Sequence, residues 1–235
     1  ELTITGNVGI SCPSSNTAWI DANGLGRVLH VSPGASLTLN NVVLLHGADS
    51  SPEGGAGILN EGQLSTYRVA IAQCTGNVAA AIRNTGTMSM DASGIGDNGP
   101  GPAILNDGYA ELHDVGIGLN EGVGLQNSAQ AQLEFVRITR NDGGGIVNVG
   151  TGVATPANVD LLTSVVVSNG GPGALAGGLV NVMGRATLRR CTVSGNRGTN
   201  ASPIYASGFG SVLALENVTI AANGSALSPA AAVEA

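Results

Sequence analysis

The chain is poor in charge and in aromatic side chains. Only 11% of its 235 residues are charged, all nine basic residues are arginine, and the aromatics are one Trp, three Tyr and two Phe. A net charge of −7 without lysine excludes the clustered basic surface that nucleic-acid binding requires. A hydrophobic content of 43% argues against a disordered chain. With so few aromatics, the core is expected to consist of small and branched aliphatic side chains.

Long apolar runs and metal-binding motifs are also missing. No segment approaches the 18 apolar residues of a transmembrane helix. The cysteines Cys12, Cys74 and Cys191 lack the spacing of a metal site, so we expect no metal ion and no cofactor. Cys74 and Cys191 fall in slots of a repeat and are expected to be buried, whereas Cys12 stays a candidate for a disulfide. The sequence opens at Glu1 without a signal peptide, as a processed product or an excised fragment would.

What the chain has in abundance is glycine, 37 residues, together with a repeated phrase of an aliphatic residue, any residue and Asn. Its asparagines lie 24, 22, 21, 21 and 33 residues apart, and a second series of Asn follows a longer apolar segment of each repeat. The first series is Asn60, Asn84, Asn106, Asn127, Asn148 and Asn181. The second series is Asn98, Asn120, Asn141, Asn169, Asn196 and Asn223. A period near 22 residues is too short for a repeated pair of helices.

The longer apolar segment alternates with strand periodicity and then skips one residue. In the copy Ala110, Leu112, Val115 and Ile117, offsets of two indicate strands, and the offset of three marks a corner. Three short strands and three turns fit one repeat. The sequence therefore predicts an all-β parallel β-helix (β-solenoid) of about nine coils, with three short strands per coil. Identical amides stacked along the axis would hydrogen-bond, and Asn would also supply left-handed backbone at the corners.

The repeat divides the chain into three parts. Residues 1–26 are expected to form an irregular first coil in which Trp19 plugs the apolar core. Residues 27–224 carry the β-helix repeats, and residues 225–235 form a terminal strand or a linker. Insertions rich in Gly, Pro and Ala break the period and are interpreted as spacers, at residues 49–54, 152–158 and 170–177.

Three phrases carry a family resemblance: residues 26–39, residues 57–64 (Gly-Ile-Leu-Asn-Glu-Gly-Gln-Leu) and residues 191–196 (Cys-Thr-Val-Ser-Gly-Asn). On these phrases the chain resembles bacterial right-handed parallel β-helix repeat proteins of the pectin-lyase-like superfamily. It is most similar to surface-protein repeats that follow a CSLREA motif, which this sequence lacks. Chlamydial polymorphic outer-membrane proteins carry similar repeats. The resemblance implies a right-handed coil and a secreted, bacterial, extracellular or cell-surface protein.

Ionisable residues concentrate at outward positions of the longer apolar segment. The expected register places Asp91, His113, Glu134, Arg189 and Glu216 in one column, with Glu111 and Asp160 in the column beside it. Such a face could bind Ca²⁺ or supply general acid and base groups, and it could equally be a solvated strand face. Enzymes of the resembled superfamily place acidic and basic residues on the outer face of one sheet, but polygalacturonase-type signatures are absent here. His30 and His46 are expected at outward or corner positions.

Two functions follow as expectations. The first is a non-enzymatic secreted or cell-surface β-solenoid with a structural or adhesive role, assembling end to end through uncapped coils. Its partners would be further copies or neighbouring coils, with surface glycans as additional candidates. The alternative is a polysaccharide-active lyase or hydrolase that uses Asp91, Glu111, His113, Glu134 and Arg189.

Overall fold

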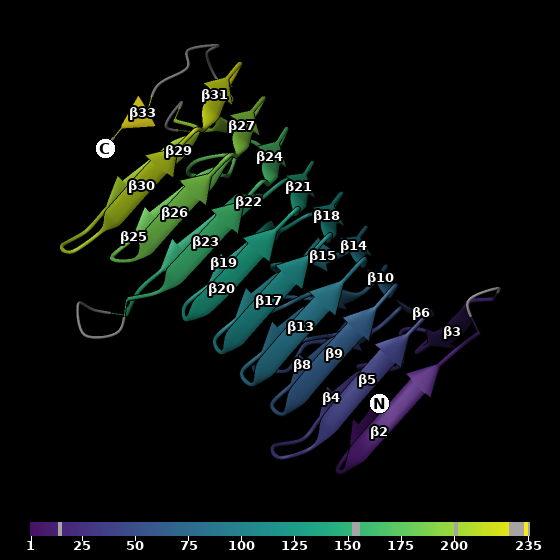
Figure 1. Cartoon of the computed structure of the whole chain (residues 1–235). Coiled ribbons are helices and arrows are strands. Elements are labelled where there is room, and N and C mark those ends of the chain that lie inside the picture. Colours follow the sequence, from purple (N-terminus) through teal and green to yellow (C-terminus); the bar gives the residue numbers. More distant parts are fainter. Residues whose placement is uncertain (14–15, 152–155, 200–201, 226–232, 235) are drawn as a thin grey trace.

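The computed structural model describes residues 1–13, 16–151, 156–199, 202–225 and 233–234. Throughout these residues the secondary structure is strand and turn, without a helix, and the chain winds in successive coils from one end of a rod to the other (Figure 1). No helix that could cross a membrane occurs in the part of the chain so described. The predicted all-β class is confirmed.

Each coil contributes one strand to each of three parallel sheets. Sheet A has ten strands: β1 (Leu2–Ile4), β4 (Leu29–Val31), β8 (Ile58–Asn60), β12 (Ile82–Asn84), β16 (Ile104–Asn106), β19 (Val123–Asn127), β22 (Gly144–Val149), β25 (Leu179–Val182), β29 (Ile204–Ser207) and β33 (Val233–Glu234). Sheet B has nine: β2 (Asn7–Ser11), β5 (Ser36–Asn40), β9 (Gln63–Tyr67), β13 (Thr87–Asp91), β17 (Tyr109–His113), β20 (Gln130–Glu134), β23 (Asn158–Leu162), β26 (Arg185–Arg189) and β30 (Val212–Glu216). We number the coils 1 to 9 by these sheet B strands.

The third side and two shorter sheets complete the coil. Sheet C has nine strands: β3 (Ala18–Asp21), β6 (Val42–Leu45), β10 (Ala70–Ala72), β14 (Gly94–Gly96), β18 (Gly116–Gly118), β21 (Arg137–Thr139), β24 (Val165–Val167), β27 (Thr192–Ser194) and β31 (Thr219–Ala221). The shorter sheets are β7 (Ala48–Asp49), β11 (Thr75–Gly76) and β15 (Gly99–Pro100), and β28 (Arg197–Gly198) with β32 (Gly224–Ser225). Nine coils of three main strands form the predicted parallel β-helix. Its right hand stays a prediction.

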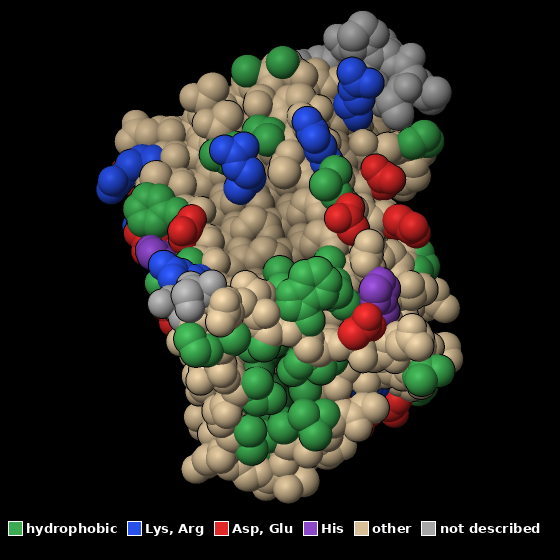
Figure 2. Space-filling model, turned by 90° about the vertical axis from the view of Figure 1, so that its right-hand side faces the viewer, with side chains coloured by type: hydrophobic (Ala, Val, Ile, Leu, Met, Phe, Trp, Pro, Cys, Tyr) green, Lys and Arg blue, Asp and Glu red, His purple; other side chains and the backbone are tan. Residues whose placement is uncertain are grey.

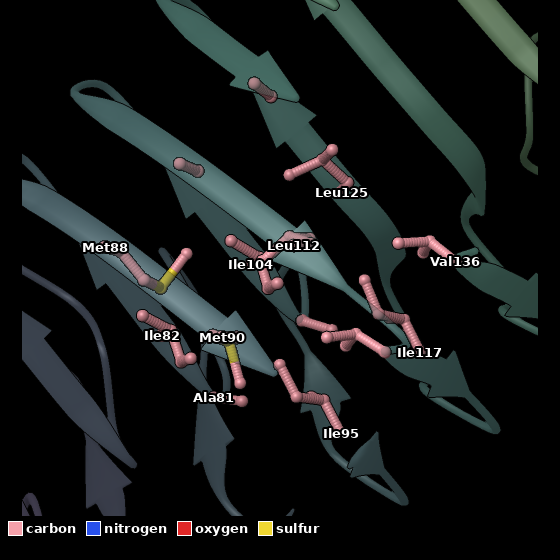
Figure 3. Packing of buried hydrophobic residues seen from close by; sticks show 14 of the residues in the cluster. Ala81, Ile82, Met88, Met90, Ile95, Ile104, Leu112, Ile117, Leu125 and Val136 are labelled. Carbon is pink, nitrogen blue, oxygen red and sulfur yellow. The ribbon is translucent and has the colours of Figure 1, made fainter. Parts of the chain in front are cut away.

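The core is a stack of aliphatic side chains in exact strand register. Ile82 pairs with Ile104 and Ile104 with Leu125, so each inward residue packs on its counterpart one coil away. Figure 3 shows these side chains between the sheets, with Met88 and Met90 in the same coil as Ile82. No aromatic ring belongs to the hydrophobic core of the described residues. Stacking of equivalent residues on each coil buries a continuous core, as in other solenoids.

Two ladders of buried asparagine run along this core. In the first, the side-chain Nδ2 of each asparagine up to Asn148 donates to Oδ1 of the Asn in the next coil, at 2.6 Å from Asn60 to Asn84 and at 2.7 Å from Asn106 to Asn127. In the second, Asn120 donates to Asn141 at 2.8 Å in the same direction. The amides also donate to backbone carbonyls, so the first ladder ties the turn from sheet A to sheet B and the second ties the turn after sheet C.

The ladder asparagines do not supply the left-handed backbone at the corners, so that prediction is wrong for them, although Asn41 and Asn217 adopt it between sheets B and C. Positive φ angles fall instead on the residues between sheets B and C and on those just before the second ladder. Examples are Phe135 (φ 55°) and Leu119 (φ 62°), which precede Val136 and Asn120. The ladder amides must point inward to bond one another, so the strained conformation passes to the neighbouring residue, whose side chain lies outside the core.

Trp19 is not a plug. It lies on the outer face of sheet C, where it pairs in register with Val43, and it is 70% exposed. A side chain in strand β3 alternates between faces, and Ile20 takes the inward position. All three cysteines are free, and burial raises the pKa of the Cys74 thiol to about 11.

The expected insertions differ in how they are held. Residues 49–54 are tied to the first two coils by Arg27, whose guanidinium lies 2.7 Å from the Asp49 carboxylate and 2.6 Å from that of Glu1. In the insertion at 170–177, Ala174 and Ala176 are buried, and Thr199 donates its backbone N–H to the carbonyl of Ala174. The insertion at 152–158 lies largely outside the described residues, as does the segment 225–235 apart from residue 225 and the two residues of β33.

Candidate functional site

The outer face of sheet B carries the candidate site. Its strands are five residues long and stand at the front of Figure 1, with no described element over them. Because side chains alternate, the first, third and fifth residues of each strand point outward. In β17 these are Tyr109, Glu111 and His113, while Ala110 and Leu112 are buried in the core.

The register places one ionisable column along the fifth position of these strands. We call it the outer column, and it runs from coil 4 to coil 9 as Asp91, His113, Glu134, Leu162, Arg189 and Glu216. The predicted site residues Asp91, His113, Glu134 and Arg189 all lie in it, interrupted by Leu162. Glu111 lies in the neighbouring column, separated from Asp160 by Gln132.

His113 is the most constrained side chain of the column. Its Nδ1 lies 2.9 Å from Asp91 Oδ1 one coil below, and its ring meets Phe135 edge-on with centroids 5.5 Å apart. The hydrogen bond to Asp91 raises the pKa of His113, and the charges of Asp91, Glu134 and Asp114 add to that effect. Both partners of the pair are about half exposed, so water screens this interaction.

A groove of about 330 Å³ opens over the column at coils 5 to 8. Leu162 lies in the groove, with His113 and Glu134 lining it on the N-terminal side and Arg189 on the C-terminal side. A second recess of about 400 Å³ continues past Arg189 to Arg185 and Glu216. The groove and the recess share Asp160 and Arg189, and each is lined by both negative and positive groups.

Two arginines, Arg185 and Arg189, line these hollows. Neither Arg185 nor Arg189 forms an ion pair with any described residue, whereas Arg27 and Arg83 each contact a carboxylate at 2.7 Å. Within the described ranges, no group of three His, Cys, Asp or Glu side chains is placed to hold a metal ion. The site therefore offers a histidine–aspartate pair, two guanidinium groups without an ion pair, and four further carboxylates, those of Glu111, Glu134, Asp160 and Glu216.

His30 and His46 lie away from this face, as the sequence suggested. His30 points outward from sheet A, 2.7 Å from the Glu61 carboxylate, and His46 occupies a corner with φ 50°, 2.9 Å from Asp21. Sequence reasoning missed the contribution of aromatics. Phe135 beside the column is 49% exposed, and its position directly after Glu134 at a corner was the available signal.

No protein-family model matches the chain, and no curated protein or solved structure matches it either.

Proposed function

We propose that this chain is a non-enzymatic, secreted or cell-surface β-solenoid with a structural or adhesive role. The resemblance to bacterial surface-protein repeats of the pectin-lyase-like superfamily supports this location. The asparagine ladders support a stiff rod, because from coil 4 to coil 8 each coil is bonded to the next at two buried turns. A rod of this kind holds its outward side chains at a fixed spacing of about 4.8 Å per coil.

The observation that carries end-to-end association is the exposure of core positions at both ends. Leu2 and Leu215 take inward positions in the first and last coils, yet they are 48% and 41% exposed. Hydrophobic side chains gather at the lower end of the molecule in Figure 2, the end at which the chain begins in Figure 1. Strand edges of this kind pair readily with another strand. A second copy of the chain would supply both strands that pair with these edges and apolar side chains that cover the exposed leucines.

Charge favours a head-to-tail orientation. Residues 1–121 contain eleven Asp and Glu against three Arg, while residues 122–235 contain five against six. The acidic first half of one rod would therefore meet the more basic second half of the next, an arrangement that stacking in the opposite sense lacks.

Sedimentation velocity over a range of concentrations tests this proposal. The wild-type chain should form a series of particles in multiples of the 23.1 kDa mass, and Leu215→Arg should abolish those larger than a dimer by charging the open end of the core. Thr38→Arg, on the exposed outer face of coil 2, is the matched control and should associate normally. Wild-type particles that never exceed a dimer at any concentration would rule the proposal out.

The groove favours one second candidate, a polysaccharide-active lyase or hydrolase. The His113–Asp91 pair could transfer a proton, and Glu111, Glu134 and Arg189 line the same depression. Assays for unsaturated products and for reducing ends on uronate polysaccharides test it. Activity that disappears in Glu134→Ala and persists in Ser89→Ala would support this candidate, and no turnover by the wild type would eliminate it.

A further inference from the structure

The charges of the outer column follow an order that is opposite on the two sides of Leu162. One coil before it stands Glu134 and one coil after it stands Arg189. Two coils before it stands His113 and two coils after it stands Glu216. When His113 is protonated, the order from His113 to Glu216 is therefore positive, negative, neutral, positive, negative. If a second copy of this column is turned end for end and placed against the first, each charged side chain faces one of opposite charge and Leu162 faces Leu162.

We propose that two copies of this chain pack sheet B against sheet B as an antiparallel dimer. The two-fold axis lies between the copies, runs parallel to the strands and passes between the Leu162 side chains of the two copies. It places Glu134 opposite Arg189 of the second copy, and His113 opposite Glu216 of the second copy. Each of these pairs occurs twice because the contact is isologous. This inference goes beyond end-to-end association, which uses other surfaces.

The solenoid geometry makes the match hold over the whole column. Both copies share one coil spacing of about 4.8 Å, so aligning Leu162 aligns all five positions at once. Sheets that pack face to face lie about 10 Å apart, which lets the two leucines meet and longer side chains reach across. Leu162 is partly buried beside its longer neighbours, and the groove around it leaves room for side chains of a second copy.

The groups involved are free to make these contacts. Glu134, Arg189 and Glu216 form no ion pair with any residue that the structure describes, although Arg189 and Glu216 are register neighbours. His113 uses Nδ1 for Asp91, its ring contacts Phe135 edge-on, and about half of its side chain stays exposed. The raised pKa of His113 favours the cation that Glu216 would meet.

The neighbouring column, formed by the third residues of the same strands, adds one favourable and one unfavourable contact to the dimer. It would place Gln132 opposite Thr187 of the second copy, a pair that can hydrogen-bond, but it would also place Asp160 opposite its own counterpart.

The size of the contact limits the affinity of the dimer. Five coils of five residues present about 400 Å² per copy, about 800 Å² in total, which is below the standard size of a stable interface. The dimer is therefore weak, and salt weakens it further because ion pairs orient it.

Charge reversal with complementation tests the dimer by sedimentation equilibrium at low salt. Glu134→Arg and Arg189→Glu each place like charges opposite one another, so each variant alone should lose at least about tenfold in self-association. An equimolar mixture of the two variants makes both contacts complementary and should regain dimers of wild-type affinity. The double variant Glu134→Arg with Arg189→Glu should dimerise by itself. Ser65→Arg, exposed on the same face outside the column, is the control.

Complementation separates a lost contact from a damaged fold, since a misfolded variant would not be rescued by its partner. Single variants that dimerise like the wild type, or a mixture that stays monomeric, would overturn the proposal. Leu215→Arg distinguishes the two modes of association, because it removes end-to-end contacts and leaves the sheet B dimer intact. Loss of the dimer in Leu215→Arg would likewise refute the antiparallel arrangement.

Discussion

Asn106 donates its side-chain amide to Asn127 Oδ1 over 2.7 Å, and both side chains are fully buried. The same amide donates to the carbonyl of Gln130 at 2.9 Å, and Asn106 Oδ1 accepts from Asn84 at 2.7 Å. One residue thus satisfies polar groups in three successive coils. The ladders stabilise the rod through such shared bonds.

Removing one amide from the ladder should be costly. Asn106→Leu leaves the partly buried carbonyl of Gln130 and the buried Asn127 Oδ1 without this donor, and a buried unsatisfied group costs about 1–3 kcal/mol. We expect the free energy of unfolding in urea to fall by about 3–4 kcal/mol. Gln126→Ala, at the outward position beside Asn127, should change it by less than about 0.5 kcal/mol. Equal losses in the two variants would contradict the role of the ladder.

Two buried hydroxyl groups in contact should respond differently to removal. Ser93 Oγ accepts the backbone N–H of Val69 at 3.1 Å and donates to the carbonyl of Asp91 at 2.7 Å, whereas Thr66 has only a 3.4 Å contact with Ser93. Ser93→Val should therefore lower thermal stability, by about 1–2 kcal/mol, because it leaves a buried N–H without a partner. Thr66→Val should be neutral or stabilising, since the Thr66 hydroxyl makes only that long contact and no backbone group depends on it. Calorimetry of both variants decides, and a larger loss for Thr66→Val would refute this assignment.

Glycine is required where coils touch and dispensable where they do not. A Cβ on Gly86 would lie 2.1 Å from the carbonyl oxygen of Gly62, while a Cβ on Gly116 meets nothing within 4 Å. Gly86→Ala should cost about 1–3 kcal/mol, kept moderate because the chain accommodates Ala129 at the corresponding place two coils on. Gly116→Ala should raise stability by about 0.4–1 kcal/mol through the unfolded chain. Urea denaturation gives the free energy of unfolding of both variants. A lower stability for Gly116→Ala than for Gly86→Ala would contradict this prediction.

The Asp91–His113 pair should make stability depend on pH. Because Asp91 raises the pKa of His113 in the folded chain, the pair stabilises fully below the ordinary value of 6.5, and the effect is lost as pH rises through the raised value. The melting temperature of Asp91→Asn should fall below that of the wild type in acid and converge with it at alkaline pH. In NMR titration, the midpoint of His113 should drop in Asp91→Asn, with Asp97→Asn as the control. An unchanged midpoint would show that the hydrogen bond does not tune this histidine.

Much of the architecture is encoded in spacing that can be read without coordinates. Ile82, Ile104 and Leu125 pair because one coil consumes a nearly constant number of residues, so periodicity alone specifies register. The outer column follows from the same count, since His113 and Glu134 hold equal places in adjacent repeats.

Other features carry no periodic signal. The left-handed corners fall on residues as different as Arg68, Ala92 and Phe135, because the fold imposes that conformation whatever the side chain. Trp19 was misplaced because a large apolar residue was expected to be buried, whereas strand alternation in β3 turns it outward. The clamp of Arg27 on Glu1 and Asp49 joins residues from different coils whose contact depends on the path of an insertion.

The direction of the ladders has a mechanical consequence. In both series, each bond between two ladder asparagines runs from the amide of one coil to the Oδ1 of the next coil toward the C-terminal end, so a force along the rod loads these bonds in the same sense. The boundaries are similar but separate, and the weakest one opens before its neighbours are affected. Stretched from its ends, the rod would lengthen in discrete steps of one coil, each releasing about 70 Å of extended chain. Such a rod would dissipate a pull in stages while the remaining coils kept their shape.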